Sequence, residues 1–227
     1  MKNTINIGIP SKGRLRKDVL NIFKKKKLNL VSERGERDLI GSVKNKSNLK
    51  ILYLHAREII ERLGDGSLDL GFSGFDLLKE SGINTQKKIY VLKKYGFGKA
   101  NLVIAIPDPW IDVQTVADLE EIAFEFRDKK KKRLRVATKY PNLTREFLFS
   151  KGVTQFRLVD SLGATEAYPF TGSAELITDI TSTGETLKAN NLRVLKDGQI
   201  LRSEACMLLS SSSQTKNGIK KLTKLLS

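Results

Sequence analysis

The sequence predicts an α/β protein with parallel sheets and two lobes. Predicted strands alternate with predicted helices along the whole chain, which is typical of parallel α/β sheets. The length of 227 residues suits one large domain or two small ones. The chain is expected to cross between the lobes twice, near Tyr95 and near Thr186. We therefore expect lobe I at residues 1–94 and 187–227, lobe II at residues 95–186, and a central cleft between them.

The N-terminal segment predicts the first strand, because Ile5–Ile9 alternates in hydropathy. The loop Pro10–Leu15 follows and carries Lys12 and Arg14, and apolar residues at helical spacing then continue to about Lys25. A strand, a short basic glycine loop and a helix form a ligand-binding edge in an α/β sheet. Lys12 and Arg14 are therefore either solvated loop charges or phosphate ligands. The planar fork of Arg14 makes it the better phosphate ligand of the two.

Two more strand-to-helix turns follow in lobe I. The segment Leu49–Leu54 predicts a strand before a helix at Arg57–Leu63. The segment Leu68–Phe72 predicts a short strand, and the turn from Ser73 to Asp76 then enters another helix. A turn of this kind is a routine helix N-cap, so alone it is a weak sign of binding.

Lobe II and the C-terminal part continue the alternation of strands and helices. The predicted strands are Asn101–Ile106, Leu134–Thr138, Phe156–Val159, Leu192–Leu195 and Ala205–Leu209. The predicted helices are a short one at Thr115–Ile122 and one that begins near Tyr140. The last two strands are expected to return to lobe I. The chain ends in a basic amphipathic helix over residues 216–226.

The stretch Gly163–Leu187 is the most informative part of the sequence. An apolar run at Ala174–Ile180 leads into S-T-G-E-T at residues 182–186, which opens a helical pattern. The free N–H groups and the positive end of the helix dipole form an anion site there, and the hydroxyls add donors. The same five residues also fit an ordinary N-cap. Asp179, just upstream, suits ribose hydroxyls or a phosphate-bound metal.

Longer motifs favour the anion site over the simple cap. From Glu166 to Asn190 the chain reads E-A-x-P-x-x-G-x-A-[acid]-x-I-x-D-x-x-S-T-G-x-T-L-x-x-N, which resembles the signature of the ATP phosphoribosyltransferase family. Three other strings resemble the family in the same order: P-x-K-G-R-L from Pro10, D-L-G-x-x-G-x-D from Asp69, and A-T-x-Y-P-N-L-T-R from Ala137. One position departs, because the family usually has Asp where this chain has Glu175.

The resemblance implies a two-lobed fold like that of the type II periplasmic binding proteins. It also implies a glycosyltransferase that joins ATP to 5-phosphoribosyl 1-diphosphate in the first step of histidine biosynthesis. Nitrogen 1 of adenine attacks the anomeric carbon, pyrophosphate leaves with magnesium, and the product is phosphoribosyl-ATP. No strong protein nucleophile is needed, so catalysis can rest on positioning and charge stabilisation.

The resemblance assigns the site residues. The ligands of the 5-phosphate are Ser182, Thr183, Gly184 and Thr186. The catalytic residues are Arg14, for the diphosphate or the nucleotide phosphates, and Asp179, for the ribose hydroxyls or Mg²⁺. The further substrate-binding residues are Lys12, Ser73, Tyr140 and Glu166, and Asp76 joins Asp179 as a magnesium ligand.

The resemblance also bears on partners. Long forms of the family carry an extra C-terminal regulatory domain, for which this chain lacks the room. It resembles the short form, which works with a separate regulatory subunit similar to histidyl-tRNA synthetase, so we expect a hetero-oligomer. The C-terminal helix either contacts that subunit or packs on lobe I.

Composition limits the class of protein. The chain has 41 Lys and Arg against 25 Asp and Glu, a formal net charge of +16, which attracts polyanions without saying which. Cys206 and His55 are each the only residue of their type, which excludes a disulfide framework and a cysteine or multi-histidine metal site. We see no signal-peptide pattern and no apolar run of about 20 residues. We therefore expect a cytoplasmic protein with no membrane partner.

The sequence leaves the role of two basic stretches undecided. Residues 129–135 read KKKKRLR, which is either a solvated loop or a source of the field that attracts ATP or another polyanion. Arg34 and Arg37 lie in a polar segment that predicts a loop or hairpin, and they have the reach to contact a phosphate.

Two other classes of protein share some of these features. A solute-binding module would have the same fold and would bind its ligand without turnover. A nucleic-acid-binding protein would explain the net charge, and its affinity would fall steeply with salt. The ordered motifs favour the enzyme over both, and we expect no nucleic-acid partner.

Overall fold

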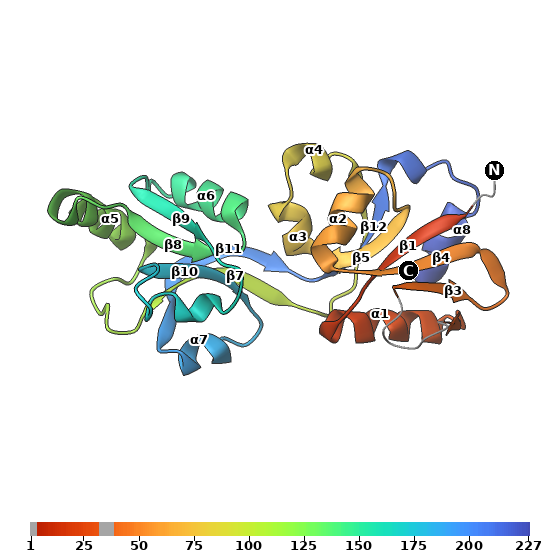
Figure 1. Cartoon of the computed structure of the whole chain (residues 1–227), viewed down its shortest axis with the longest axis horizontal. Coiled ribbons are helices and arrows are strands. Elements are labelled where there is room, and N and C mark those ends of the chain that lie inside the picture. The colour runs from red at the N-terminus through yellow and green to blue at the C-terminus, as the bar shows by residue number, and fades with distance from the viewer. Residues whose placement is uncertain (1–3, 32–38) are drawn as a thin grey trace. The chain divides into compact units, whose positions relative to one another are not determined.

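The computed structural model describes residues 4–31 and 39–227 of the chain. The chain divides into two compact units: unit 1 contains Met1–Gly98 and Glu204–Ser227, and unit 2 contains Lys99–Ser203. Each unit has a sheet with helices on both faces (Figure 1), which confirms the predicted α/β class. The cleft expected between the lobes stays a prediction.

The unit boundaries differ from those expected. The first crossing follows Gly98 rather than residue 94, and the second follows Ser203 rather than residue 186. Strand β11 (Leu192–Ser203) causes the second difference, because it pairs with β7 (Ala100–Pro107) inside unit 2. Of the two strands expected to return to lobe I, only β12 (Ala205–Ser210) belongs to unit 1.

Among the described residues, unit 1 has a seven-stranded sheet in the order β2-β3-β4-β1-β5-β12-β6. Its other strands are β1 (Ile5–Pro10), β2 (Leu30–Val31), β3 (Ile40–Val43), β4 (Lys46–Leu54), β5 (Leu70–Gly74) and β6 (Ile89–Lys94). Its helices are α1 (Gly13–Lys25), α2 (Ala56–Gly64), α3 (Phe75–Glu80), α4 (Ile83–Gln86) and α8 (Ile219–Leu226). Strand β1 pairs in parallel with β4 and β5. Their carboxyl ends therefore share one edge, from which α1, α2 and α3 start.

Helix α2 lies unusually close to the unit 1 sheet, and two glycines allow it. A Cβ atom added to Gly71 would lie 2.5 Å from Cγ2 of Ile59 on α2, and one added to Gly8 would lie 3.2 Å from Cγ1 of the same side chain. The opposite face of the sheet is covered by α1 and α8 (Figure 1). The glycines thus fix the N-terminus of α2 at the carboxyl edge of β1, β4 and β5.

The sheet of unit 2 has the order β11-β7-β10-β8-β9. Its other strands are β8 (Leu134–Thr138), β9 (Phe156–Asp160) and β10 (Leu176–Thr181), and its helices are α5 (Val116–Lys130), α6 (Pro141–Ser150), α7 (Glu185–Ala189) and the 3₁₀ turn η2 (Thr165–Ala167). Strand β8 pairs in parallel with both β9 and β10. One core lies under α5 and α6, and a smaller one lies under α7 and η2. The carboxyl ends of β8, β9 and β10 therefore form a second shared edge.

Helix α5 extends further than the sequence pattern indicated, to Lys130 instead of Ile122. It starts with a capping box between Thr115 and Asp118 and ends where Lys131 adopts a left-handed φ of 52°. The basic run at residues 129–135 therefore comprises a helix end, a left-handed turn and the start of β8.

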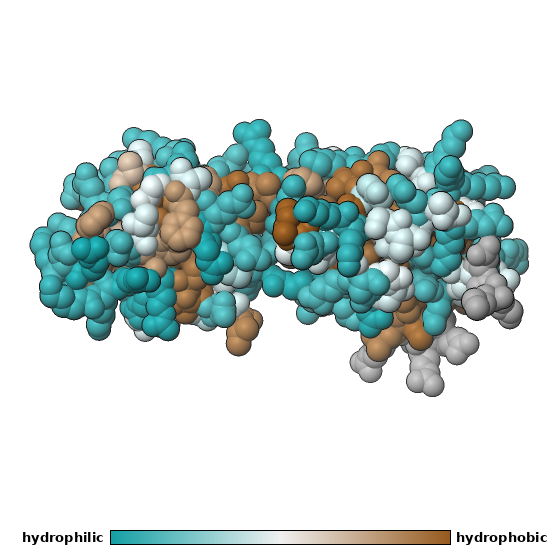
Figure 2. Space-filling model, turned by 90° about the horizontal axis from the view of Figure 1, so that it is seen from above, coloured by the Kyte–Doolittle hydropathy of each residue, from teal (hydrophilic) through white to brown (hydrophobic). Residues whose placement is uncertain are grey.

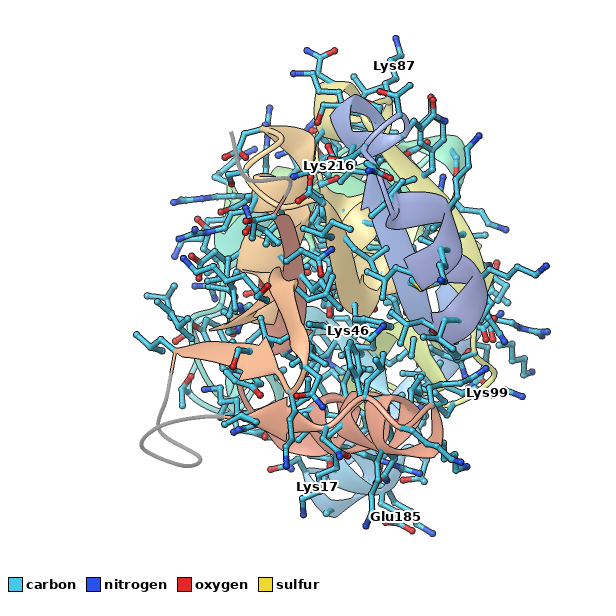
Figure 3. The ribbon with its side chains drawn as sticks, turned by 90° about the vertical axis from the view of Figure 1, so that its right-hand side faces the viewer. Lys17, Lys46, Lys87, Lys99, Glu185 and Lys216 are labelled. Atoms are coloured by element: carbon cyan, nitrogen blue, oxygen red, sulfur yellow. The ribbon has the colours of Figure 1, made fainter. Side chains whose placement is uncertain are left out.

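The two units differ in charge. Unit 1 contains 25 Lys and Arg and 11 Asp and Glu, a net charge of +14, whereas unit 2 contains 16 and 14, a net charge of +2. Figure 3 shows Lys17 and Lys87 pointing outward from unit 1. None of the described helices is both long enough and apolar enough to cross a membrane.

Candidate functional site

The carboxyl edge of β8, β9 and β10 gathers the predicted site residues of unit 2. Tyr140 follows β8, Glu166 follows β9, and Asp179 lies near the end of β10. The backbone N–H of Ser161 donates to the carbonyl of Thr138 at 3.0 Å, which holds the loops after β9 and β8 together. In α/β sheets ligands bind at this edge, outside the carboxyl ends of the strands.

The loop after β10 has the local geometry expected of a phosphate cradle. Gly184 adopts φ 79°, and its N–H donates to Oγ1 of Thr181 at 2.9 Å. The first hydrogen bond within α7 runs from the N–H of Lys188 to the carbonyl of Gly184 at 3.0 Å. The N–H groups of the first turn therefore lie ahead of the intrahelical ladder. The side chains at the turn, those of Ser182, Thr183 and Thr186, are exposed.

Part of this loop is already bonded within the chain. The N–H of Glu185 donates to Oγ1 of Thr183 at 3.4 Å, which is a long hydrogen bond. Thr183 therefore has a structural contact beside its predicted role, whereas its hydroxyl proton remains available for an anion. The cap interpretation and the phosphate interpretation are compatible at this loop.

Asp179 lies beside Glu166 and Lys139. Its carboxylate accepts the N–H of Ile180 at 2.8 Å. Burial raises the pKa of Asp179 above its ordinary value, and the charge of Glu166 adds to the rise. The hydrogen bond from Ile180 and the positive charge of Lys139 act in the opposite direction. Glu166 and Lys139 are thus close enough to Asp179 to influence its charge, where the sequence predicted contacts with ribose or Mg²⁺.

Glu166 lies in η2, and a hydrogen bond of the preceding residue holds this turn in place. Thr165 is buried, and its hydroxyl lies 2.9 Å from that of Ser161. Glu166 itself is half-buried. Its side chain therefore has a fixed base at the carboxyl edge while its carboxylate still has contact with solvent.

Tyr140 is buried at the start of α6, and its backbone N–H donates to Oγ1 of Thr138 at 2.9 Å. Thr138 belongs to a buried hydroxyl cluster with Thr144 and Thr178, in which the oxygens lie 2.5 to 3.2 Å apart. The sequence reasoning missed this cluster. It depends on the register that places Thr138 of β8 opposite Thr178 of β10, and no local pattern shows that register.

Glu175 forms an ion pair within unit 2. It accepts the N–H of Arg135 at 2.7 Å, and one of its oxygens lies 2.6 Å from Nη2 of Arg135. Glu175 precedes β10, so it lies at the amino edge of these strands, away from Asp179. Glu175, which stands where the family usually has Asp, therefore acts in this ion pair and not at the carboxyl edge.

The carboxyl edge in unit 1 gathers Lys12, Arg14, Ser73 and Asp76. The N–H of Ser11 donates to the carbonyl of Leu54 at 2.8 Å, which joins the loops after β1 and β4. Lys12 and Arg14 are exposed at the start of α1, where the first turn contains no acid. A basic first turn is unfavourable for the helix dipole, which an anionic ligand would relieve.

Ser73 and Asp76 lie deeper than Lys12 and Arg14. The buried hydroxyl of Ser73 donates to the carbonyl of Ala56 at 2.9 Å, so it fixes the start of α2 against β5. Asp76 is buried over Gly74 and is among the groups that raise the pKa of Cys206. Both residues have structural contacts, and their substrate and metal roles stay predictions.

The structure adds Arg16 to this edge. Its Nη1 donates to the carbonyl of Ser11 at 2.9 Å, and its guanidinium lies 5.0 Å from the ring centroid of Tyr53. Arg16 thus supports the loop that carries Lys12 and Arg14. The basic residues Arg34 and Arg37 lie outside the described part of the chain.

His55 and Cys206 have structural positions, as the sequence predicted. His55 caps α2 by accepting the N–H of Arg57 at 3.3 Å. Cys206 is buried in β12, and burial raises its pKa to about 11. A thiol with this pKa stays protonated at neutral pH, so it is a poor nucleophile.

In the part of the chain that the structure describes, no three acidic, histidine or cysteine side chains gather in a way that would hold a metal by themselves. Mg²⁺ usually keeps several waters and is bound by one or two carboxylates together with substrate phosphates. The Asp179 and Glu166 carboxylates fit this second mode.

Comparisons with known proteins agree with the resemblance found in the sequence motifs. The model of the HisG family, described as ATP phosphoribosyltransferase, matches residues 55–227. An ATP phosphoribosyltransferase of Nitrobacter winogradskyi is 45% identical over 226 residues, covering 100% of this chain and 70% of the relative. An ATP phosphoribosyltransferase of Brucella melitensis biotype 2 is 43% identical over 220 residues, covering 96% of this chain and 95% of the relative.

Solved structures give the fold. A chain of the ATP phosphoribosyl transferase (HisG:HisZ) complex from Thermotoga maritima aligns with a TM-score of 0.77 at 24% identity, covering 98% of this chain and 96% of that chain. The arginine-, lysine-, histidine-binding protein ArtJ from Geobacillus stearothermophilus aligns with a TM-score of 0.56 at 11% identity, covering 98% and 87%. The predicted likeness to substrate-binding proteins is therefore confirmed at the level of fold.

Proposed function

Because this chain belongs to the ATP phosphoribosyltransferase family, we propose that it transfers the 5-phosphoribosyl group of phosphoribosyl diphosphate to N1 of ATP. The products are phosphoribosyl-ATP and pyrophosphate, and the reaction is the first step of histidine biosynthesis. The observation that carries the proposal is the exposed hydroxyl loop at residues 182–186 beside Asp179 and Glu166, within the part that matches the family.

The loop after β10 binds the 5-phosphate in this proposal. The hydroxyls of Ser182, Thr183 and Thr186 donate to phosphate oxygens, and the backbone at Gly184 adds N–H donors. Bonds from neutral donors to a charged phosphate are about twice as strong as bonds between neutral groups. The phosphate thus fixes one end of the ribose, so the anomeric carbon is presented to ATP in a defined position.

Asp179 binds the ribose hydroxyls, and Glu166 lies next to it. Burial makes the carboxylate of Asp179 a stronger hydrogen-bond acceptor than it would be in water. Positive charge develops on the ribose ring when the diphosphate leaves, and a nearby negative carboxylate stabilises it. Asp179 therefore serves both positioning and charge stabilisation.

Arg14 and Lys12 bind the diphosphate or the phosphates of ATP. Both are exposed at the basic start of α1, which supports this assignment. The guanidinium of Arg14 can take two phosphate oxygens at once. Tyr140 and Ser73 complete the substrate-binding set as residues that shape the carboxyl edges of the two sheets.

Mg²⁺ accompanies phosphoribosyl diphosphate, and Asp179 and Asp76 are the proposed protein ligands. The ion would neutralise charge on the departing diphosphate. The pair of Asp179 and Glu166 supports a role for the first of these two. Asp76 has less support, because its carboxylate is buried against Gly74.

The partner is a regulatory subunit similar to histidyl-tRNA synthetase, in a cytoplasmic hetero-oligomer. The HisG:HisZ complex from Thermotoga maritima, a structural neighbour, supports an assembly of this kind. Helix α8 was one candidate contact. It packs on unit 1 through Ile219, Leu222 and Leu226, which leaves its outer face, with Lys220, Lys221 and Lys224, for any contact.

Release of pyrophosphate tests the function. The purified chain is mixed with ATP, phosphoribosyl diphosphate and Mg²⁺, and pyrophosphate is detected through pyrophosphatase and phosphate release. We expect a signal that needs both substrates, from the chain alone or after addition of the regulatory partner. Ligand binding with no pyrophosphate release in either case would indicate a solute-binding module instead.

A further inference from the structure

The edge of the unit 2 sheet opposite the candidate site carries two adjoining hollows. The first, of about 370 Å³, is partly aromatic, with Trp110, Phe126, Lys130, Lys132, Arg135 and Glu175 in its wall. The second, of about 590 Å³, is basic, with Arg127, Lys131, Lys132, Arg133 and Gln155 around it. Lys132 borders both, so the two hollows meet at this side chain.

The positions of these residues in the strands separate the hollows from the candidate site. Arg133 precedes β8, Gln155 precedes β9, and Glu175 precedes β10. Because the three strands are parallel, their amino ends share one edge. Thr138 lies at the carboxyl end of β8, and a five-residue strand spans about 17 Å. The hollows and the phosphate loop are therefore at opposite edges of one sheet.

The basic hollow has uncompensated positive charge. Lys131, Lys132 and Arg133 are exposed, and among the described residues no acidic side chain forms an ion pair with them. Lys129, in the same run, is paired with Glu125 at 3.0 Å and borders neither hollow. A cluster of unpaired cations on one edge attracts a compact polyanion such as phosphate.

The acid in the aromatic hollow does not oppose a phosphate. One oxygen of Glu175 lies 2.6 Å from Nη2 of Arg135, so its charge is compensated. On another side of Trp110 and Phe126, a third hollow of about 290 Å³ includes Asp112. Its one acid, Asp112, is set against its one base, Lys130, so this hollow has no net positive charge to hold a phosphate. A phosphorylated ligand on these rings therefore directs its phosphates toward Lys132.

The aromatic hollow suits a planar ring. Trp110 and Phe126 are half-buried, so each keeps an accessible part of its ring on a fixed support. The Nζ atom of Lys130 lies over the ring of Phe126, 3.7 Å from its centroid, so it covers one face of that ring and leaves Trp110 as the main stacking surface. Bases stack on such side chains without regard to sequence. Figure 2 shows mostly hydrophilic side chains at the end of unit 2 that carries α5.

We propose that this amino edge of unit 2 is a second ligand site, which binds a nucleoside 5′-phosphate with its base stacked on Trp110, next to Phe126, and its phosphate on Lys131, Lys132 and Arg133. The base fills the aromatic hollow, and the phosphate reaches the basic hollow through Lys132. None of these residues takes part in the proposed transfer reaction. An experiment can therefore contradict this site without contradicting the proposed function.

Trp110 makes the site directly observable, because it is the only tryptophan of the chain. The full chain is titrated with AMP while tryptophan fluorescence is recorded, for the unchanged chain, Lys132→Glu and the matched control Lys129→Glu. Both variants change the net charge equally. We expect saturable quenching, a rise in Kd of at least about tenfold in Lys132→Glu, and a rise of less than about twofold in Lys129→Glu.

Two further arms distinguish the site from other sources of the signal. Arg14→Ala, at the candidate active site, is expected to keep the quenching, and adenosine without phosphate is expected to bind at least about tenfold more weakly than AMP. Pyrophosphate release is expected to be unchanged in Lys132→Glu. Equal Kd values for Lys132→Glu and Lys129→Glu, loss of quenching in Arg14→Ala, or tighter binding of an oligonucleotide than of AMP would each overturn the proposal.

Discussion

Burial and the proposed function favour opposite charge states of the Asp179 carboxylate. Its partly buried place on β10 favours the neutral form and raises its pKa, whereas the proposed contacts with ribose or Mg²⁺ need the charged form. Groups whose pKa is shifted by burial and by a specific neighbour are enriched at functional sites. The free chain therefore holds this carboxylate in its charged form at a cost in stability, and we expect bound substrate to offset that cost.

The pH dependence of Asp179→Asn tests this cost. The raised pKa means that the folded state keeps the proton to a higher pH than the unfolded chain, so the group lowers stability as pH rises above its ordinary value of 3.8. Asp179→Asn removes this penalty. We expect it to raise the free energy of unfolding at pH 7 and to change it little below about pH 3.8, as measured by urea unfolding across pH. A loss of stability at pH 7 would contradict the assignment.

Removal of the Thr186 hydroxyl is the most specific test of the phosphate loop. Hydrogen bonds to charged groups contribute about 1.5–3 kcal/mol, so Thr186→Ala is expected to lower kcat/KM for phosphoribosyl diphosphate about 10- to 100-fold. The matched control is Thr154→Ala, which removes an exposed hydroxyl elsewhere in unit 2. Equal effects of the two substitutions on pyrophosphate release would remove the loop from the site.

Local motifs predicted the exposed side of the site and missed its buried side. The glycine, hydroxyl and basic residues at the strand ends follow from turn chemistry and charge, which are local properties. The hydroxyl cluster of Thr138, Thr144 and Thr178 depends on strand register, and the contact between Glu175 and Arg135 joins residues 40 positions apart. Such pairings are decided by tertiary packing, which one sequence does not display.

Among the elements near the site, α2 and β5 pack closely. A Cβ atom on Gly71 would meet Ile59 and Leu63, so Gly71→Ala is expected to cost about 1–3 kcal/mol of unfolding free energy. Gly163→Ala is the control, because its Cβ would have open space and its change should stay within about 0.5 kcal/mol. Urea unfolding measures both. Similar values for the two variants would show that α2 shifts away without cost.

Most elements were predictable from hydrophobic period, and the errors have physical causes. Helix α5 was expected to end near Ile122, because beyond that residue its charges outnumber its apolar positions, yet Phe126 continues the buried face. Strand β11 was assigned to the wrong lobe, because an apolar strand pattern does not say which neighbour it pairs with. The α/β class itself followed from alternation over the whole chain.

At the scale of the whole molecule, the excess charge is concentrated in unit 1. Its net charge of +14 accompanies a carboxyl edge at which Lys12 and Arg14 are exposed. Long-range fields of this sign draw anionic substrates toward the protein, and salt screens them over about 10 Å at 0.1 M. We propose that this charge, which the sequence left unexplained, helps to capture two polyanionic substrates.

Salt is therefore expected to act on capture more than on chemistry. We expect KM for ATP to rise several-fold between about 0.05 and 0.5 M salt, while kcat changes less than about twofold. Initial rates at varied ATP, in chloride salts of two different cations, measure this and separate screening from ion-specific effects. A fall in kcat at constant KM would show that salt acts on assembly or folding instead.

The identity of the product tests the proposed transfer reaction most directly. The chain is incubated with ATP, phosphoribosyl diphosphate and Mg²⁺, with and without a regulatory subunit similar to histidyl-tRNA synthetase, and the nucleotides are separated and identified by mass spectrometry. We predict phosphoribosyl-ATP in amounts equal to the pyrophosphate released, and an initial rate of formation of both that is lower in Thr186→Ala. Pyrophosphate without the N1-linked product, or unchanged ATP under both conditions, would contradict this prediction.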